Sequence, residues 1–521
     1  MDNALLDLLR ADLESAGYSY GRVRVLQGDA GASALSRGIF GPARRAIRRA
    51  APGPGVTLTQ LFLLGEEVSV PELALAFPSL GADGAERLGL ITRNADTARA
   101  ALSLNPVVIP DPITDAADDP VHWWILSDLD DGLRGGPARS DHVMGVGGAT
   151  RSLIAQASLG LGDGFAECAA LDLGTGCGVI AMVLAHRGAR RVVATDISER
   201  ALMFARANAR LNEYDDIEFR RGDLFEPVAG ECFDLILANP PFVITPRGNG
   251  EGARYEYRDG GMTGDELAAK VVREAPIHLA ETGRLVCLAN WESRPEGDGL
   301  SRVRRWIDQA AELCGGDLDA WVIERDRVDP AVYAETWVRD GGARVGDPAF
   351  DGLVADWIDD FEERRVSAIG LGSIRIRRNP PGERSVVRAE RAMGALAAQR
   401  LGTILEENFA AASRAARLDD EEALSTRWIA SRRVREEREH IPGIESPQAI
   451  SLIVDAPIGR RIEVDPLLAA ALGASDGELT LGQIAAALAE LLDVDEGEAA
   501  VALVEGFREL AWLGMVAPEP R

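Results

Sequence analysis

Four consecutive residues, Asn239, Pro240, Pro241 and Phe242, follow an apolar segment, 233–238, that is typical of a buried strand. Two prolines in a row fix the backbone and remove two N–H donors, so the neighbouring carbonyl groups are presented as acceptors. The Asn239 side chain adds another acceptor, and the Phe242 ring offers a flat apolar surface. Two rigid acceptors can hold both hydrogens of a planar –NH₂ group and draw its nitrogen lone pair out of conjugation. The alternative is an ordinary Asn-Pro turn.

A glycine-rich turn follows an earlier apolar segment, 169–173, and precedes a predicted helix. Its glycines lie at alternate positions, Gly174, Gly176 and Gly178, and Thr175 separates the first two. Such glycines let the backbone turn tightly and approach a ligand without a Cβ clash, and the N–H groups of the next helix then face that ligand. The G-x-G-x-G spacing differs from the G-x-G-x-x-G of dinucleotide-binding turns.

Three acidic residues follow successive predicted strands. Asp172 directly precedes the glycine turn, where a carboxylate would repel a pyrophosphate but would suit the amino cation of a methionine moiety. Asp196, followed by Ile197, lies about 20 residues after that turn, as a ribose-binding carboxylate does. Asp223, followed by Leu224, comes shortly after the third strand, where an adenine amino group would lie. Each acid alone is typical of a cap or turn, but the ordered set predicts a site for S-adenosylmethionine.

The elements that must position these residues alternate between strand and helix from about residue 165. The predicted strands lie at 169–173, 191–195, 217–220, 233–238 and 284–288. This alternation predicts a Rossmann-like α/β domain, with a parallel sheet covered by helices on both faces. Two later segments, 320–324 and 368–377, are expected to supply the last strands, with helical insertions between them.

The chain has 521 residues, enough for about three domains. We expect a helical, winged-helix-like N-terminal domain at 1–115, the α/β domain at 120–385 and an acidic, helical, winged-helix-like C-terminal domain at 386–521. Within the last, the charged stretch 432–440 is predicted to be helical. A winged helix often binds DNA, but the expected recognition helix at 70–77 has no Arg or Lys, which favours packing or substrate docking.

The composition limits the classes of partner. The chain has 83 acidic and 56 basic residues, a net charge of -27, and therefore no general attraction for nucleic acid or anionic membranes, although a local basic patch stays open. No stretch approaches the roughly 18 apolar residues of a membrane span, and the N-terminus lacks a signal peptide. The five cysteines are scattered without metal-like spacing, so we expect reduced thiols, no metal and a cytoplasmic protein.

Residues 169–290 resemble the class I methyltransferases that carry an N-P-P-[FY] motif. Within that group they are most similar to the glutamine methyltransferases of peptide-chain release factors and to the small-domain ribosomal RNA methyltransferases. The resemblance implies that 172–178 binds the methionine part of the cofactor, Asp196 the ribose, and that Asp223 lies near the adenine. It also implies that the Asn239 tetrad borders the cofactor and binds the target nitrogen.

The resemblance extends to two further segments. Residues 258–265 are similar to the D-G-G-x-D-G segment of the release-factor enzymes, and 141–148 lies where the family has a segment that covers the cofactor. Two features differ: Phe242 stands where Tyr is commoner in the family, and the flanking domains do not match the short helical domain of the bacterial release-factor enzymes.

Together these features predict direct in-line methyl transfer from S-adenosylmethionine to a planar nitrogen, without a metal or a covalent enzyme intermediate. The expected acceptor is a glutamine amide in a protein, for example a translation factor. The alternatives are an amino group of an RNA or DNA base, a natural-product amine or peptide, and a non-catalytic scaffold that only binds the cofactor. His142 and His278 are expected to be structural.

Overall fold

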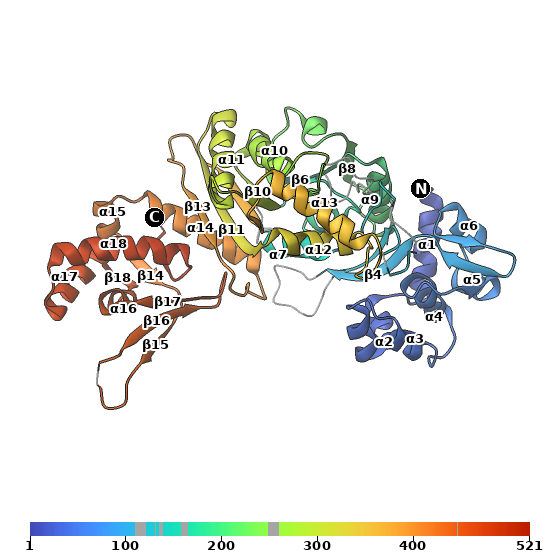
Figure 1. Ribbon diagram of the computed structural model, residues 1–521, viewed down its shortest axis with the longest axis horizontal. Helices are drawn as coiled ribbons and strands as arrows, with labels where there is room; N and C mark the ends of the chain where they lie inside the picture. The colour runs from blue at the N-terminus through green and yellow to red at the C-terminus, as the bar shows by residue number, and fades with distance from the viewer. Residues whose placement is uncertain are drawn as a thin grey trace.

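The computed structural model describes residues 1–109, 121–130, 132–134, 139–157, 165–247, 260–444 and 446–520. The molecule is elongated, with the N-terminal helices at one end, a large sheet in the middle and the C-terminal helices at the other end (Figure 1). None of the helices in the described ranges is long and apolar enough to cross a membrane.

The N-terminal part begins with helices and ends in a small sheet. The helices are α1 (Asn3–Ser15), α2 (Tyr20–Leu35), α3 (Gly41–Ile47), α4 (Pro54–Leu58) and the π-helix η1 (Thr59–Leu63). There follow β1 (Val68–Ser69), α5 (Val70–Ala76), α6 (Gly81–Arg87), β2 (Ile91–Arg93) and β3 (Thr97–Ala100), with the strands in the order β1-β3-β2. Two helices and a hairpin are therefore present, while their assignment as a winged helix stays a prediction.

An eight-stranded sheet forms the centre, in the order β13-β11-β12-β10-β9-β6-β7-β8. Its strands are β6 (Ala169–Leu173), β7 (Arg191–Asp196), β8 (Ile217–Arg221), β9 (Phe233–Ala238), β10 (Leu279–Ser293), β11 (Leu318–Val328), β12 (Ala368–Arg378) and β13 (Val387–Arg391). The strands β6 to β10 are parallel, and β12 lies antiparallel between β10 and β11. The Rossmann-like fold is thus confirmed, and the two late segments are strands of the same sheet. The edge strand β13 begins just beyond the predicted boundary at 385.

Helices cover both faces of this sheet because successive strand residues point to opposite sides. Ala170 and Leu235 pack with α8 (Val179–His186) and α9 (Glu199–Leu211), whereas Leu171 and Ile236 pack with α10 (Glu266–Glu274) and α11 (Gly299–Cys314). The short 3-10 helices η2 (Glu226–Val228) and η3 (Ala275–His278) complete the connections. The predicted alternation of strands and helices therefore produces two apolar clusters, one on each face of the sheet.

Two further helices, α12 (Pro330–Asp340) and α13 (Phe350–Glu363), are inserted between β11 and β12. They form an apolar cluster of their own with the segment that follows β9, since Val243 and Ile244 are buried against Tyr333, Trp357 and Phe361. The insertion is therefore packed against the chain just downstream of the Asn239 tetrad.

The antiparallel pair β4 (Ser103–Ile109) and β5 (Val121–Ser127) connects the N-terminal part to the sheet domain. Two asparagines one turn apart, Asn208 on α9 and Asn212 just after its end, hold β5. Asn208 accepts from Leu126 N at 2.7 Å and donates to the carbonyl oxygens of Leu126 and Cys177, both at 2.9 Å. Asn212 likewise accepts from Trp124 N at 3.0 Å. Because Cys177 belongs to the glycine turn, Asn208 ties β5 to the predicted site.

The C-terminal part packs against β11 of the sheet through α14 (Leu401–Arg417). The same helix also contacts α7 (Gly148–Gln156). Its other elements are α15 (Asp420–Ser425), β14 (Arg427–Ala430), β15 (Arg435–Glu439), β16 (Ala449–Val454), β17 (Arg460–Val464), α16 (Pro466–Gly473), β18 (Asp476–Thr480), α17 (Leu481–Leu492), α18 (Glu496–Trp512) and β19 (Val516–Pro518). The Trp321 ring of β11 lies 5.8 Å from the ring of Trp512, so the domain is joined to the sheet by an apolar contact.

The predicted helix at 432–440 is wrong, because β15 occupies this stretch as an exposed edge strand. It pairs antiparallel with β16, and Arg461 of the third strand forms an ion pair with Glu437. Hydrogen bonds to the neighbouring strand outweigh the local preference of a charged segment. The winged-helix assignment of 386–521 remains a prediction.

Replacing Asn208 by alanine should lower the free energy of unfolding by about 3 kcal/mol, since buried polar groups left without a partner cost about 1–3 kcal/mol each. Asn208 is 0% exposed. Asn212→Ala is the matched control and should cost about 1 kcal/mol at most, because Asn212 and its partner Trp124 are half-buried and water can reach them. Urea unfolding of both variants measures the difference. A smaller loss in Asn208→Ala than in Asn212→Ala would contradict this account.

Candidate active site

The strand order reverses at β6, which has β7 on one side and β9 on the other. In open α/β sheets, ligands bind beyond the carboxyl ends of the strands at this reversal. Leu173 of β6 is paired with Thr195 of β7 and with Ala238 of β9. A Cβ atom on Gly174 would lie 4.0 Å from the Cα atom of Pro240. The structure therefore brings the glycine turn next to the proline tetrad.

The glycine turn needs its glycines for conformation and for space. Gly174, Gly176 and Gly178 have φ angles of 76°, 55° and 87°, in the region that other residues rarely adopt. The backbone amides of Gly174 and Thr175 both donate to the carbonyl oxygen of Thr195 in β7, at 3.0 and 2.9 Å. A Cβ atom on Gly178 would lie 2.9 Å from the Cα atom of Ala205 in α9. The turn is thus held close to both β7 and α9.

Asp172 is 0% exposed at the end of β6. Its Oδ2 atom accepts from the Thr175 hydroxyl at 2.6 Å and from Ala181 N at 3.0 Å. Its Oδ1 atom is buried and has no hydrogen-bond partner among the described residues. Burial raises the pKa of the Asp172 carboxyl to about 7. A cation at Oδ1 would stabilise the charged form that the protein interior disfavours.

Asp196 is partly buried at the end of β7, and both of its carboxylate oxygens face backbone amides. Oδ2 accepts from Gly176 N and Oδ1 accepts from Ser198 N, both at 2.9 Å. These bonds hold the carboxylate at the start of α9. The next residue, Ile197, is 58% exposed and offers apolar surface beside it.

Asp223 lies after β8 and forms an ion pair with Lys270 of α10, with 3.0 Å between Oδ2 and Nζ. This hydrogen bond raises the pKa of Lys270 above its ordinary value. Leu224 adopts the left-handed region with a φ of 45°, which is uncommon for a residue with a side chain. Sequence reasoning missed Lys270, although its being the single lysine of the chain was a usable signal.

The tetrad follows β9 as predicted. The Asn239 side-chain oxygen is buried and has no hydrogen-bond partner within the described ranges. Pro240 is buried and Pro241 is half-buried, while the half-buried Phe242 ring packs against both the α8–α9 cluster and the α12–α13 cluster. The structure thus presents one acceptor oxygen and one aromatic ring on a rigid segment beside the glycine turn.

The segment after the tetrad is anchored by Tyr333, a buried residue of α12 that sequence reasoning missed. Its hydroxyl oxygen accepts from Ile244 N at 3.1 Å and from the Asn290 amide of β10 at 2.8 Å. No local signal marks Tyr333, because it lies about ninety residues downstream, in the inserted helices, and reaches the tetrad only through the fold.

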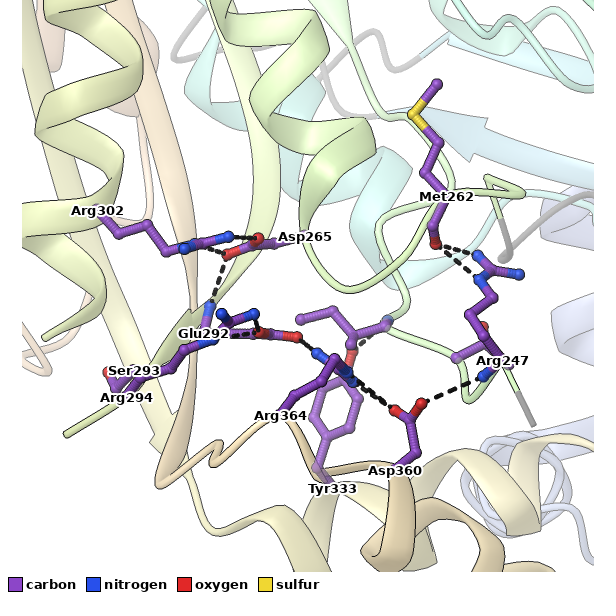
Figure 2. Close-up of polar contacts among 12 residues, drawn as sticks. Arg247, Met262, Asp265, Glu292, Ser293, Arg294, Arg302, Tyr333, Asp360 and Arg364 are labelled. Carbon is purple, nitrogen blue, oxygen red and sulfur yellow. Dashed lines mark hydrogen bonds and ion pairs between the residues drawn. The ribbon is translucent and has the colours of Figure 1, made fainter. Parts of the chain in front are cut away.

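A network of charged residues continues this anchoring (Figure 2). Arg247 donates from its backbone to Asp360 of α13 at 3.3 Å and from Nε to the Met262 carbonyl at 2.8 Å. Asp265, at the end of the 258–265 segment, receives two hydrogen bonds of 2.7 Å from Arg302 of α11. Residues 258 and 259 lie outside the described residues. The predicted family segment is therefore fastened to α11 and, through Arg247, to α13.

A cavity of about 440 Å³ opens at the carboxyl end of β10. It is lined by Glu292, Arg294, Glu296, Gly297, Arg302, Arg305, Glu363, Arg364 and Arg365. None of the residues predicted to hold the cofactor lines it. Carboxylates already pair with four of its five arginines, Arg294, Arg302, Arg364 and Arg365.

The segment predicted to cover the cofactor packs against β5 and the start of α9. Asp128 accepts from Val143 N at 2.9 Å and from Arg200 Nε at 3.0 Å, and His142 Nδ1 lies 3.9 Å from the same carboxylate. The covering role stays a prediction. The His278 ring stacks on Phe225 with 4.8 Å between ring centres, a packing contact.

Two families match parts of the chain. Residues 161–302 match the methyltransferase small domain, and residues 15–101 match a domain of unknown function (DUF7059). The matched segment 161–302 contains the strands from β6 to β10 and every residue predicted for the cofactor and the target nitrogen.

Two curated relatives are similar over the same region. The ribosomal protein uL3 glutamine methyltransferase of Xanthomonas campestris is 37% identical over 124 residues, 23% of this chain and 40% of that protein. The release factor glutamine methyltransferase of Xylella fastidiosa is 37% identical over 185 residues, 34% of this chain and 64% of that protein. The chain thus spans less than two thirds of either relative's length.

Among solved structures, the ribosomal protein L11 methylase of Lactobacillus delbrueckii subsp. bulgaricus is 18% identical, with a TM-score of 0.24, over 44% of this chain and 79% of that one. The family match, by contrast, coincides with the strand reversal, the glycine turn and the proline tetrad. Residues 161–302 of the chain therefore match the methyltransferase small domain, and this matched segment holds all three features.

Proposed function

We propose that this protein transfers the methyl group of S-adenosylmethionine to the side-chain amide nitrogen of a glutamine in an acceptor protein. The observation that carries the proposal is the pair of buried acceptor oxygens, Asp172 Oδ1 and Asn239 Oδ1, which have no hydrogen-bond partner among the described residues. They lie at the ends of paired strands. Because buried unpaired polar atoms are costly, such a pair supports binding of a ligand there.

The residues around β6 and β7 fit the methyl donor. Asp172 would hold the amino cation through its free Oδ1 atom, and the turn 174–178 would let the backbone approach the methionine part. Asp196 would accept hydrogen bonds from the ribose hydroxyls, and the apolar Ile197 side chain would border the nucleoside. Asp223, held by Lys270, and Leu224 would lie at the adenine. When bound, the cofactor supplies an electrophilic methyl group on a sulfonium centre.

The tetrad would hold the acceptor. Asn239 Oδ1 and a carbonyl oxygen beside the prolines take the two N–H bonds of the amide, and Phe242 supports its flat face. The tetrad would thereby turn the lone pair of the nitrogen toward the methyl donor, and this alignment would supply most of the rate acceleration. The amide proton is lost after transfer, so no general base is required of the chain.

The choice of glutamine is supported by the relatives, which are named as glutamine methyltransferases of ribosomal protein uL3 and of a release factor. Both names indicate protein acceptors that function in translation. We therefore place the acceptor of this chain among proteins of the translation machinery. The two flanking regions, 1–115 and 386–521, would select and orient that acceptor.

Replacing Asn239 by alanine should lower kcat about 100-fold or more, which is typical when one hydrogen-bonding group of a preorganised site is removed. Cofactor affinity should change less than about threefold, because the proposed contacts of Asn239 are mainly to the acceptor. Radiolabel transfer measures kcat, and titration calorimetry measures the affinity. Normal turnover in this variant would contradict the proposed role of the tetrad.

The affinity for S-adenosylmethionine should depend on pH through Asp172. The pKa of Asp172 is raised to about 7, and only the ionised carboxylate attracts the amino cation. Below pH 7 the carboxyl is mostly protonated in the free protein, so it must lose a proton before the cofactor can bind. The dissociation constant should therefore rise about tenfold per pH unit below 7. Above about pH 8 the cofactor amino group loses its own charge, so affinity should be highest between these values.

Asp172→Asn is the control for this pH dependence. The variant keeps the shape of the side chain but has no titratable group, so it should bind the cofactor weakly and with little change below pH 7. Calorimetric titrations of both proteins on either side of pH 7 make the comparison. A wild-type affinity that stays constant from pH 5 to pH 7 would exclude Asp172 as the cation ligand.

A further inference from the structure

The charge of this acidic chain is unevenly distributed. The α2–α3 unit, residues 20–50, has a single acidic residue, Asp29, whereas the whole chain has 83 acidic and 56 basic residues. The unit has seven arginines: Arg22, Arg24, Arg37, Arg44, Arg45, Arg48 and Arg49. It is therefore a strongly positive segment within a protein of net charge -27.

Most of these guanidinium groups are exposed and only partly neutralised. Arg44 and Arg48 share one carboxylate from outside the unit, Glu66, at 3.5 and 3.6 Å. Arg45 lies in the last turn of α3 and Arg49 two residues beyond its end; both are exposed, and neither forms an ion pair with any residue that the structure describes. The unit thus keeps a positive surface after its internal pairs are counted.

The packing of α3 turns these arginines outward. A Cβ atom on Gly31 of α2 would lie 3.1 Å from the Cα atom of Ala43, so the two helices are in close contact. Ala43 and Ile47 are buried together with Leu64. Since the apolar residues of α3 are used inside the protein, the helix has no continuous apolar face with which to enter a lipid surface.

The acidic C-terminal helices are too distant to cancel this surface. Figure 1 places α2 and α3 at the opposite end of the molecule from the C-terminal helices α17 and α18. Charges separated by more than about 10 Å are largely screened at 0.1 M salt. At physiological ionic strength an anionic partner near α3 therefore responds mainly to the local arginines.

We propose that the α2–α3 unit is a docking surface for the phosphate backbone of RNA. Guanidinium groups bind phosphate through paired hydrogen bonds, and clustered arginines are the electrostatic signature of nucleic-acid contact. The choice of RNA over DNA rests on the proposed function, because an acceptor protein of the translation machinery would present its glutamine close to RNA. The surface would increase the local concentration of such an acceptor without reading a base sequence.

The test is binding of a fluorescent RNA duplex to the full chain, without methyl donor, over a series of salt concentrations. Wild-type affinity should fall linearly on a log–log plot against salt. Arg45→Ala/Arg49→Ala should weaken binding about tenfold and reduce that slope by about 2, as expected for two lost phosphate contacts. Arg432→Ala/Arg433→Ala removes the same charge from two exposed arginines of the C-terminal part and should change neither quantity.

Several outcomes would overturn the proposal. These are no RNA binding, an equal loss in both double variants, tighter binding to a DNA duplex of the same sequence, or binding only to vesicles of anionic phospholipid. Methyl transfer to a short glutamine peptide is measured in parallel and should be the same in Arg45→Ala/Arg49→Ala as in the wild type. A wild-type protein that methylates the peptide but binds no RNA would contradict the docking surface and leave the proposed function standing. A wild-type protein that binds RNA but transfers no methyl group would contradict the proposed function and leave the surface standing.

Discussion

The reversal of strand order at β6 is the constraint on which the rest of the site depends. Because β7 and β9 flank β6, the glycine turn, the Asp196 carboxylate and the Asn239 tetrad must leave the sheet at one place. The same geometry forces Asp172 into the interior, where its carboxyl is partly protonated near neutral pH. Burying a carboxyl group with an unpaired oxygen costs free energy. A cation bound at that oxygen would reduce this cost.

Other parts of the chain hold this arrangement in place. Asn208 connects α9 and β5 to the glycine turn, while Tyr333 and Asp360 of the inserted helices secure the segment after the tetrad. These contacts come from separate elements, with α9 supporting the glycine turn and the inserted helices supporting the segment after the tetrad. The positive α2–α3 unit lies away from both, which separates proposed docking from proposed chemistry.

The central fold could be predicted from sequence because its signals are local: apolar strands, alternate glycines and an acid at each strand end. Asp172 and the glycine turn have the placement that those signals indicate. Contacts across long sequence separations could not be predicted, as with Tyr333 against Ile244. The edge strand β15 was missed for a related reason, since its hydrogen bonds are made to β16 rather than within the segment. The local excess of arginines in α3 was also missed, because the net charge is a sum over the whole chain.

The central claim is tested most directly by locating the methyl group that the protein transfers. The full chain is incubated with labelled S-adenosylmethionine and a fractionated cell extract, and labelled protein is hydrolysed enzymatically to amino acids. The account predicts that label enters protein, is recovered as glutamine methylated on the side-chain nitrogen, and is lost in Asn239→Ala. Label recovered in RNA or small molecules, or on another amino acid, would contradict it.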